Sequence, residues 1–206
     1  MKHPIISILI VSLTVFALLG AGSLSDGGPT VGERAPDFTL TDAAGETHSL
    51  SDYEGQFVVL EWLNHECPFV VKHYGSGNMQ MLQEHYRDQG VVWFSIISSA
   101  PGKQGYMEPD EAVQVTSEKN ARPTAVLLDP EGVTGRAYDA RVTPHMYIIN
   151  PDGVLEYMGA IDDNPSANPA DIEGARNFVS EALDLLLDGG SPEVTSHPPY
   201  GCTVKY

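Results

Sequence analysis

The sequence has few cysteines and few basic residues. Of its 206 residues, two are cysteines and 11 are Lys or Arg, against 28 Asp or Glu, which gives a formal net charge of −17. Two cysteines are too few for a disulfide scaffold or a four-cysteine zinc site. Because so acidic a surface repels phosphate backbones and anionic lipids, we expect neither a nucleic-acid partner nor binding to a membrane surface.

One long apolar run lies at the N-terminus. Residues 5–19 follow Lys2 and are succeeded by the small residues 20–23, the layout of a secretory signal peptide. We therefore expect residues 1–23 to direct export to the periplasm or the cell exterior and then to be removed. The alternative is an uncleaved membrane anchor, because about 18 apolar residues can just span a bilayer. Export matters because disulfides persist outside the cytosol.

The rest of the chain has the pattern of an α/β protein. Continuous apolar runs predict buried strands at 57–62, 91–97 and 124–128. Hairpins are predicted over 38–50 and 146–158, and helices over 68–74, 78–88, 109–118 and 172–187. We expect a linker over 24–30, one domain over 31–189 with a mixed central sheet flanked by helices, and a C-terminal tail over 190–206 without a regular period.

Cys67 is the leading candidate for a reactive residue. It follows a predicted buried strand and precedes Pro68, and proline is favoured in the first turn of a helix. Cys67 is therefore expected at the helix N-cap, where free backbone N–H groups and the helix dipole stabilise a thiolate. The alternative is an inert buried cysteine. The neighbouring His65 and Glu66 indicate a polar turn and favour the reactive interpretation.

Several segments in order along the chain resemble the redoxin family, the AhpC/TSA-like group that includes peroxiredoxins and thioredoxin-like proteins. They are Val31–Leu40, Leu50–Gln56, the Cys67-Pro68 turn, Thr143-Pro144 and Met146–Gly153. An Asn-His-x-Cys-Pro-Phe turn and a Gly-Cys-x-Val-Lys-Tyr end resemble a bacterial subgroup. The resemblance covers roughly residues 31–188 and implies a thioredoxin-like fold with an N-terminal hairpin extension. It also implies that the Thr143–Pro144 bond is cis and packs opposite Cys67.

The chain departs from this family at positions close to Cys67. Thioredoxins have a second cysteine nearby, where this chain has Asn64 and Val70, so a local disulfide is impossible. Peroxiredoxins have a Pro and a Thr where this chain has Leu60 and Asn64, so the hydroxyl that activates peroxide is missing. Copper-delivery relatives have a second cysteine where this chain has Leu63. Since Cu(I) prefers several sulfur ligands, copper delivery is a third choice.

The second cysteine, Cys202, lies in the tail. Thirteen residues separate it from Gly189, a span of about 43 Å when extended, against a radius of gyration of about 16 Å for a domain of this size. The tail is therefore long enough for Cys202 to reach Cys67. The side chains of Tyr200 and Tyr206 can pack against the domain and hold the tail there. Cys202 is either a resolving thiol, the partner in a static disulfide, or a link to another molecule. We favour the resolving thiol.

Other residues near Cys67 are candidates for supporting roles. Glu61 on the preceding strand can transfer a proton if burial raises its pKa, or it can be an ordinary surface carboxylate. His65 can bond to the thiolate or be a solvated turn residue, and His145 is expected to face the same crevice. His65, Cys67 and His73 match no known zinc spacing, so we expect no metal. The Gly102–Gly105 turn lacks the phosphate-loop pattern, and we expect no organic cofactor.

These observations predict an exported thiol oxidoreductase. Its site comprises Cys67, Cys202, Thr143, Pro144, Glu61 and His65. Cys67 attacks a peroxide or a disulfide, Cys202 resolves the intermediate, and an external thiol, from a thioredoxin-like protein or a small molecule, reduces the pair. The alternative is a non-catalytic binding module on the same scaffold, with a structural Cys67–Cys202 disulfide. The sequence does not determine the oligomeric state.

Overall fold

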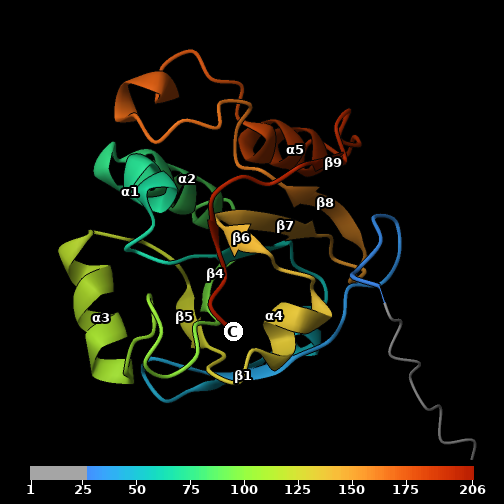
Figure 1. Cartoon of the computed structure of the whole chain (residues 1–206). Helices are drawn as coiled ribbons and strands as arrows, with labels where there is room; N and C mark the ends of the chain where they lie inside the picture. Colours follow the sequence, from blue (N-terminus) through green and yellow to red (C-terminus); the bar gives the residue numbers. More distant parts are fainter. Residues whose placement is uncertain (1–26) are drawn as a thin grey trace, which may run out of the picture.

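An eight-stranded mixed sheet forms the centre of the structure, a computed structural model that describes residues 27–206 (Figure 1). The strands are β1 (Thr39–Asp42), β2 (Thr47–Ser49), β3 (Val58–Trp62), β4 (Val92–Ile97), β5 (Ala125–Leu128), β6 (Val142–Thr143), β7 (His145–Ile149), β8 (Leu155–Gly159), β9 (Ser196–His197) and β10 (Cys202–Thr203). Their order is β2-β1-β5-β4-β3-β7-β8-β9, while β10 and β6 form a separate pair. The β3–β4 and β4–β5 pairings are parallel, whereas β1–β5 and β3–β7 are antiparallel. The predicted α/β class with a mixed sheet is confirmed.

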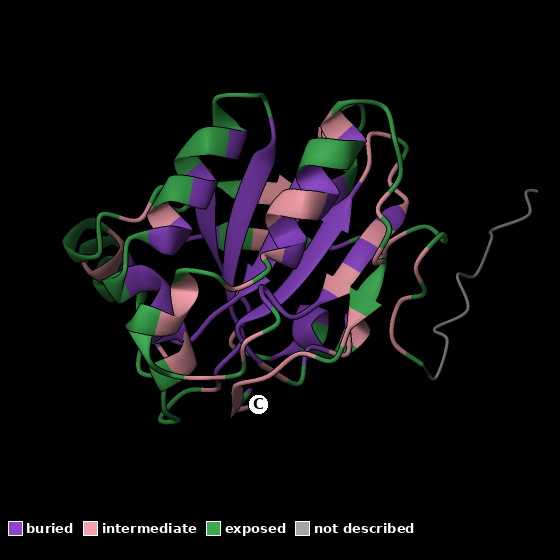
Figure 2. Ribbon diagram, turned by 90° about the horizontal axis from the view of Figure 1, so that it is seen from above, coloured by how far each residue is buried: buried purple, intermediate pink, exposed green. Residues whose placement is uncertain are grey.

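Helices cover both faces of this sheet. They are α1 (Pro68–Gly75), α2 (Asn78–Arg87), α3 (Pro109–Glu118), α4 (Val133–Ala137) and α5 (Phe178–Leu187), with 3-10 helices η1 (Leu50–Tyr53) and η2 (Pro169–Ile172). Side chains of α1, α2, α3 and α5 pack on one face with Val59, and η1 and the end of α4 pack on the other with Leu60. Every residue of β3 and β4 is buried (Figure 2), which explains why these strands are continuous apolar runs.

One helix boundary was predicted wrongly, and two short elements were missed. Helix α5 begins at Phe178 and not at residue 172, because the Asn177 side chain accepts a hydrogen bond from Ser180 N, 3.0 Å away, and caps the helix there. Helix α2 begins at Asn78, as predicted, and its N-cap is Gly77, with φ 80°. Helix α4 and strand β6 are too short to have been recognised from periodicity.

The C-terminal tail is docked on the domain, and it contains two short strands that its sequence did not predict. Strand β9 pairs parallel with β8, and β10 pairs antiparallel with β6 so that Cys202 lies opposite Thr143. Beyond β10, Val204 N donates to Arg141 O at 2.9 Å. Figure 1 shows the tail crossing the front of the molecule from β9 to the C-terminus near α4.

The N-terminal segment bears on localisation. The predicted signal peptide over residues 1–23 lies outside the described residues, as does the first part of the predicted linker. Within residues 27–206, no helix has the length and apolar character needed to cross a bilayer.

Candidate active site

Cys67 occupies the N-cap of α1. Its backbone is extended, with φ −74° and ψ 125°, and Pro68 is the first helical residue. The first helical hydrogen bond runs from Val71 N to Cys67 O at 2.8 Å. The Cys67 side chain is 0% exposed, because the cysteine lies between the sheet and the docked tail. The predicted position at a helix N-terminus beyond a buried strand is therefore confirmed.

The tail brings Cys202 against Cys67. Their Sγ atoms lie 2.6 Å apart as free thiols, although 135 positions separate the two residues in the chain. Cys67 Sγ also lies 3.1 Å from Thr143 O. The Thr143–Pro144 bond is cis, as the family resemblance implied. Three distant segments, the start of α1, the β6–β7 turn and β10, therefore meet at one pair of sulfur atoms.

The two thiols differ in acidity. Burial raises the pKa of Cys67, but the Cys202 thiol and the backbone N–H groups of Val70 and Phe69 stabilise its thiolate more strongly, so the net pKa is lowered. Burial and the adjacent Cys67 raise the pKa of Cys202. Cys67 is thus the more acidic thiol of the pair. Cys202 is also the more exposed of the two.

Gly201 allows the tail to approach Thr143 closely. Its φ is +143°, and a Cβ at this position would overlap the carbonyl oxygen and carbon of Thr143. Only glycine therefore fits between β6 and the tail without displacing one of them. This close approach places the next residue, Cys202, at its observed distance from Cys67.

Glu61 is completely buried on β3, and the surface alternative is wrong. Tyr74 donates to one carboxylate oxygen at 2.8 Å, and Trp93, Gln83 and Ser95 donate to the other at 2.9, 3.1 and 3.1 Å. Burial raises the pKa of Glu61, while these four hydrogen bonds act in the opposite direction. The carboxylate thus joins β3, β4, α1 and α2 beneath the site.

The two candidate histidines do not contact the sulfur atoms. His65 is half-buried with its ring 4.9 Å from that of Tyr74, and burial lowers its pKa to about 4. His145 is buried on β7, with Nδ1 3.0 Å from Tyr147 OH, and burial lowers its pKa to about 4 as well. Both rings are therefore neutral near pH 7. The alternative that His65 is a solvated turn residue was wrong, and the expectation that His145 faces the crevice stays a prediction.

Sequence reasoning missed a buried polar cluster beneath the tail. Lys72 and His73 on α1 are both 0% exposed, and Lys72 Nζ lies 3.0 Å from Oδ2 of the buried Asp162. A lysine on a short helix is normally exposed, so no pattern in the sequence indicated its burial.

One group of side chains among the described residues has the composition of a metal site. Ligand atoms of Asp42, Glu46 and His48 lie within 4.8 Å of one another in the β1–β2 hairpin. His48 is already engaged, with Nε2 3.1 Å from Asp42 and Nδ1 2.6 Å from Tyr53 OH. These contacts account for the cluster as a link between the hairpin and η1.

Known proteins resemble this chain in sequence and in fold. Thiol-disulfide oxidoreductase ResA of Geobacillus kaustophilus is 30% identical over 128 residues, which are 62% of this chain and 68% of that protein. Thioredoxin-like protein YneN of Bacillus subtilis is 26% identical over 152 residues, 74% of this chain and 84% of that protein. The crystal structure of an uncharacterized conserved protein from Geobacillus kaustophilus matches with a TM-score of 0.75 and 28% identity, covering 86% of this chain and 92% of that one.

These matches agree with the architecture, and the predicted thioredoxin-like fold is confirmed. The sequence profile of the AhpC/TSA family matches residues 31–158, from the N-terminal hairpin through β8. The chain therefore belongs to the AhpC/TSA family.

Proposed function

We propose that this protein is a thiol–disulfide oxidoreductase in which Cys67 is the nucleophile and Cys202 the resolving thiol. The observation that carries the proposal is the pair of free sulfur atoms 2.6 Å apart. Cys67 is the more acidic thiol and Cys202 the more exposed one. A two-cysteine cycle requires one thiol that attacks the substrate and a second thiol that resolves the intermediate. The names of the relatives support the same reaction class.

The cycle follows from these acidities. The Cys67 thiolate attacks a disulfide RSSR, forming a mixed disulfide Cys67–S–S–R and releasing RS⁻, which takes a proton from solvent. The Cys202 thiol then attacks the Cys67 sulfur, forming the Cys67–Cys202 disulfide, while its proton leaves with the departing sulfur as RSH. With hydrogen peroxide as oxidant, Cys67 becomes a sulfenic acid and releases hydroxide, and attack by the Cys202 thiol releases water.

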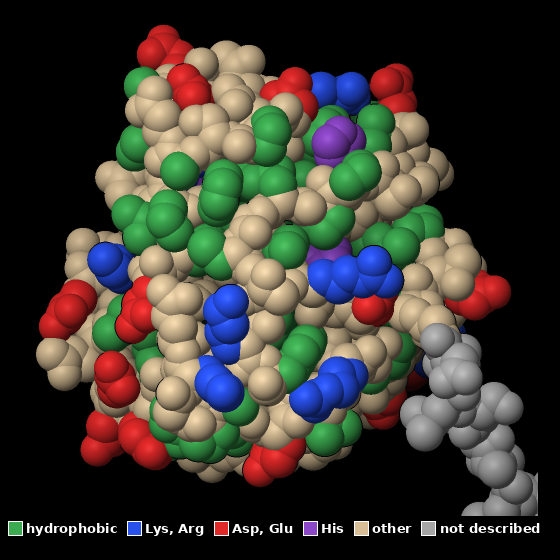
Figure 3. Space-filling model, in the orientation of Figure 1, with side chains coloured by type: hydrophobic (Ala, Val, Ile, Leu, Met, Phe, Trp, Pro, Cys, Tyr) green, Lys and Arg blue, Asp and Glu red, His purple; other side chains and the backbone are tan. Residues whose placement is uncertain are grey.

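An external thiol reductant completes the cycle. Its thiolate attacks the sulfur of Cys202, because Cys67 is the more acidic thiol and therefore the better leaving group. Cys67 then leaves as the thiolate, and a low leaving-group pKa speeds such exchange. A second thiol of the reductant attacks its own sulfur in the mixed disulfide on Cys202, so that Cys202 is released, takes up a proton, and the reductant leaves as a disulfide. Figure 3 shows Lys and Arg side chains on the face that the tail crosses, although the chain as a whole is acidic. An anionic thiolate therefore meets less repulsion here than the net charge suggests.

Disulfides are the favoured oxidant. Asn64 stands where peroxiredoxins have the Thr hydroxyl that activates peroxide, and its side-chain oxygen instead accepts a hydrogen bond from Glu66 N at 2.9 Å. Among the described residues, the partners of Cys67 Sγ are the thiol of Cys202, the carbonyl of Thr143 and backbone N–H groups. Hydrogen peroxide is therefore our second choice of oxidant for Cys67, after disulfides.

Thiol counting tests the proposal. Reduced wild type, Cys202→Ser and Cys67→Ser would receive one equivalent of oxidised glutathione or of hydrogen peroxide. Remaining thiols would then be alkylated and counted by mass spectrometry. We expect oxidised glutathione to consume both thiols of the wild type, to leave a glutathione adduct on Cys67 in Cys202→Ser, and to leave Cys67→Ser largely unmodified. If both thiols of the wild type survive treatment with oxidised glutathione, the proposal is contradicted.

A second measurement addresses the static alternative. A structural disulfide has a low reduction potential and resists mild dithiols, whereas a catalytic one is reduced rapidly. A disulfide that persists in a mild dithiol would favour the binding module.

We also propose export after cleavage near residue 23, and the mass of the mature protein checks that boundary.

A further inference from the structure

A buried charged cluster lies under the tail, close to the sulfur pair. Lys72 Nζ donates to Asp162 Oδ2 at 3.0 Å and to Asn164 O at 2.8 Å. His73 is adjacent, with Nε2 3.7 Å from Asp162 Oδ2. Lys72 and His73 are 0% exposed and Asp162 is 2% exposed, so the charges are removed from solvent. Such a cluster is stable only where its hydrogen-bonding capacity is filled.

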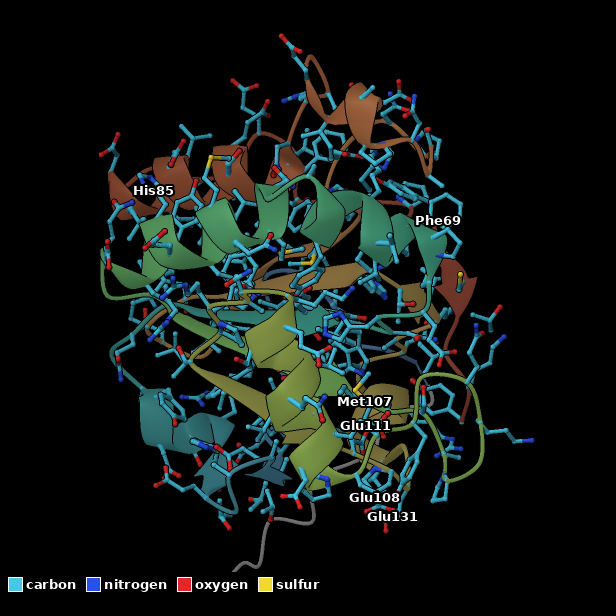
Figure 4. The ribbon with its side chains drawn as sticks, turned by 90° about the vertical axis from the view of Figure 1, so that its left-hand side faces the viewer. Phe69, His85, Met107, Glu108, Glu111 and Glu131 are labelled. Atoms are coloured by element: carbon cyan, nitrogen blue, oxygen red, sulfur yellow. The ribbon has the colours of Figure 1, made fainter. Side chains whose placement is uncertain are left out.

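Tyr200 is the side chain of the tail that enters this cluster. Its hydroxyl donates to Asp162 Oδ1 in a short hydrogen bond and lies 3.4 Å from both Lys72 Nζ and His73 Nε2. Its ring packs against Phe69 with centroids 5.6 Å apart, and Figure 4 shows Phe69 at the start of α1 beside the tail. Burial and Asp162 raise the pKa of Tyr200, so the hydroxyl stays protonated and remains a donor.

We propose that Tyr200 is a positioning residue for the Cys67–Cys202 reaction: by bonding to Asp162 and Lys72, it keeps the reduced tail docked with Cys202 against Cys67. This inference rests on the proposed function. Tyr200 precedes Cys202 by two residues, at most about 7 Å of extended chain. A fixed Tyr200 therefore confines the Cys202 sulfur to the neighbourhood of Cys67.

Docking of the tail affects the equilibrium between the two thiols and the Cys67–Cys202 disulfide. In the oxidised protein the disulfide itself holds the tail. In the reduced protein only non-covalent contacts do so, and any undocked population lowers the effective concentration of Cys202 at Cys67. Contacts that persist in both redox states leave the disulfide equilibrium unchanged. Loss of Tyr200 contacts thus shifts this equilibrium only if they are what prevents undocking of the reduced tail.

Tyr200→Phe tests this inference, because it removes the hydroxyl and retains the ring. The equilibrium is oxidised protein plus two glutathione giving reduced protein plus glutathione disulfide, measured across defined glutathione buffers. We expect Tyr200→Phe to favour the reduced protein by about 2- to 10-fold, because the lost hydrogen bond shifts the equilibrium only by the part of its free energy that exceeds the docking free energy of the reduced tail. This corresponds to a reduction potential about 10–30 mV more positive. Tyr106→Phe is the matched control, since it removes a hydroxyl that bonds to Glu108 in an exposed loop.

Hydrogen exchange supplies a readout of docking itself. In reduced Tyr200→Phe, we expect faster exchange at Val204 N, which bonds to Arg141 O, and at Ala100 N, which bonds to Lys205 O. Unchanged exchange and an unchanged equilibrium in this variant would overturn the positioning role. If instead the wild type forms no Cys67–Cys202 disulfide in any glutathione buffer, the proposed function fails first. The two failures are therefore distinguishable.

Discussion

Removing the ammonium of Lys72 should destabilise the protein strongly. Lys72→Met keeps most of the side-chain volume but leaves the carboxylate of Asp162, 2% exposed, without the cation that lies 3.0 Å away. It also removes the donor to Asn164 O at 2.8 Å. Breaking a buried ion pair in this way costs about 3–5 kcal/mol, a large part of the roughly 5–15 kcal/mol that typically holds a domain folded.

Urea unfolding of the reduced protein measures this loss. Trp62 and Trp93 are both 0% exposed, so their fluorescence reports on unfolding of the core. The double variant Lys72→Met with Asp162→Asn should be less destabilised than Lys72→Met alone, because it no longer buries an unpaired carboxylate. The matched control is Arg34→Met, whose ion pair with Glu54 at 3.3 Å has side chains that are 70% and 59% exposed. That variant should change stability by less than about 1 kcal/mol.

Two outcomes would refute this reasoning. A loss below about 1 kcal/mol for Lys72→Met would show that the pair contributes no more than a surface ion pair does. If the double variant loses the sum of the losses measured for Lys72→Met alone and Asp162→Asn alone, Lys72 and Asp162 act independently.

Three further perturbations test the site. Cys202→Ala removes the thiol that stabilises the Cys67 thiolate, so the pKa of Cys67 should rise and the pH profile of its alkylation should move to higher pH. Burial raises the pKa of Glu61 above its ordinary value of 4.5, so its stabilising effect is present below that pH and is lost as pH rises through the folded pKa. Glu61→Gln should therefore gain stability relative to the wild type as pH rises, and parallel urea curves from pH 4 to pH 8 would contradict this. Gly201→Ala adds a methyl group that overlaps Thr143, so the tail should shift and the disulfide should form to a smaller extent in a given glutathione buffer.

Local sequence signals were sufficient to place Cys67. A cysteine before a proline, after a continuous apolar strand, has little freedom to be anything but the N-cap of a helix beyond a buried strand. The two hairpins were predicted for a similar reason, since turn residues separate short apolar runs. These features depend on neighbours in the chain.

Features that depend on distant contacts could not be predicted. The pairing of β10 with β6 joins segments about sixty residues apart, and neither has more than two residues in the strand. The burial of Lys72 depends on Asp162 and Tyr200, which lie far along the chain. His65 looked solvated because its neighbours are polar, whereas the ring of Tyr74 covers it. Tertiary packing determines all three.

The tail also forms one border of the main sheet. Strand β9, two residues long, pairs with Met158 and Gly159 and is the outermost strand on that side. An uncovered strand edge offers free N–H and C=O groups to other chains, and a very short outer strand offers few of them. A chain cut before Ser196 would therefore lose its second cysteine and also expose β8 as a template for edge-to-edge aggregation. The same segment thus links redox chemistry to the solubility of the fold.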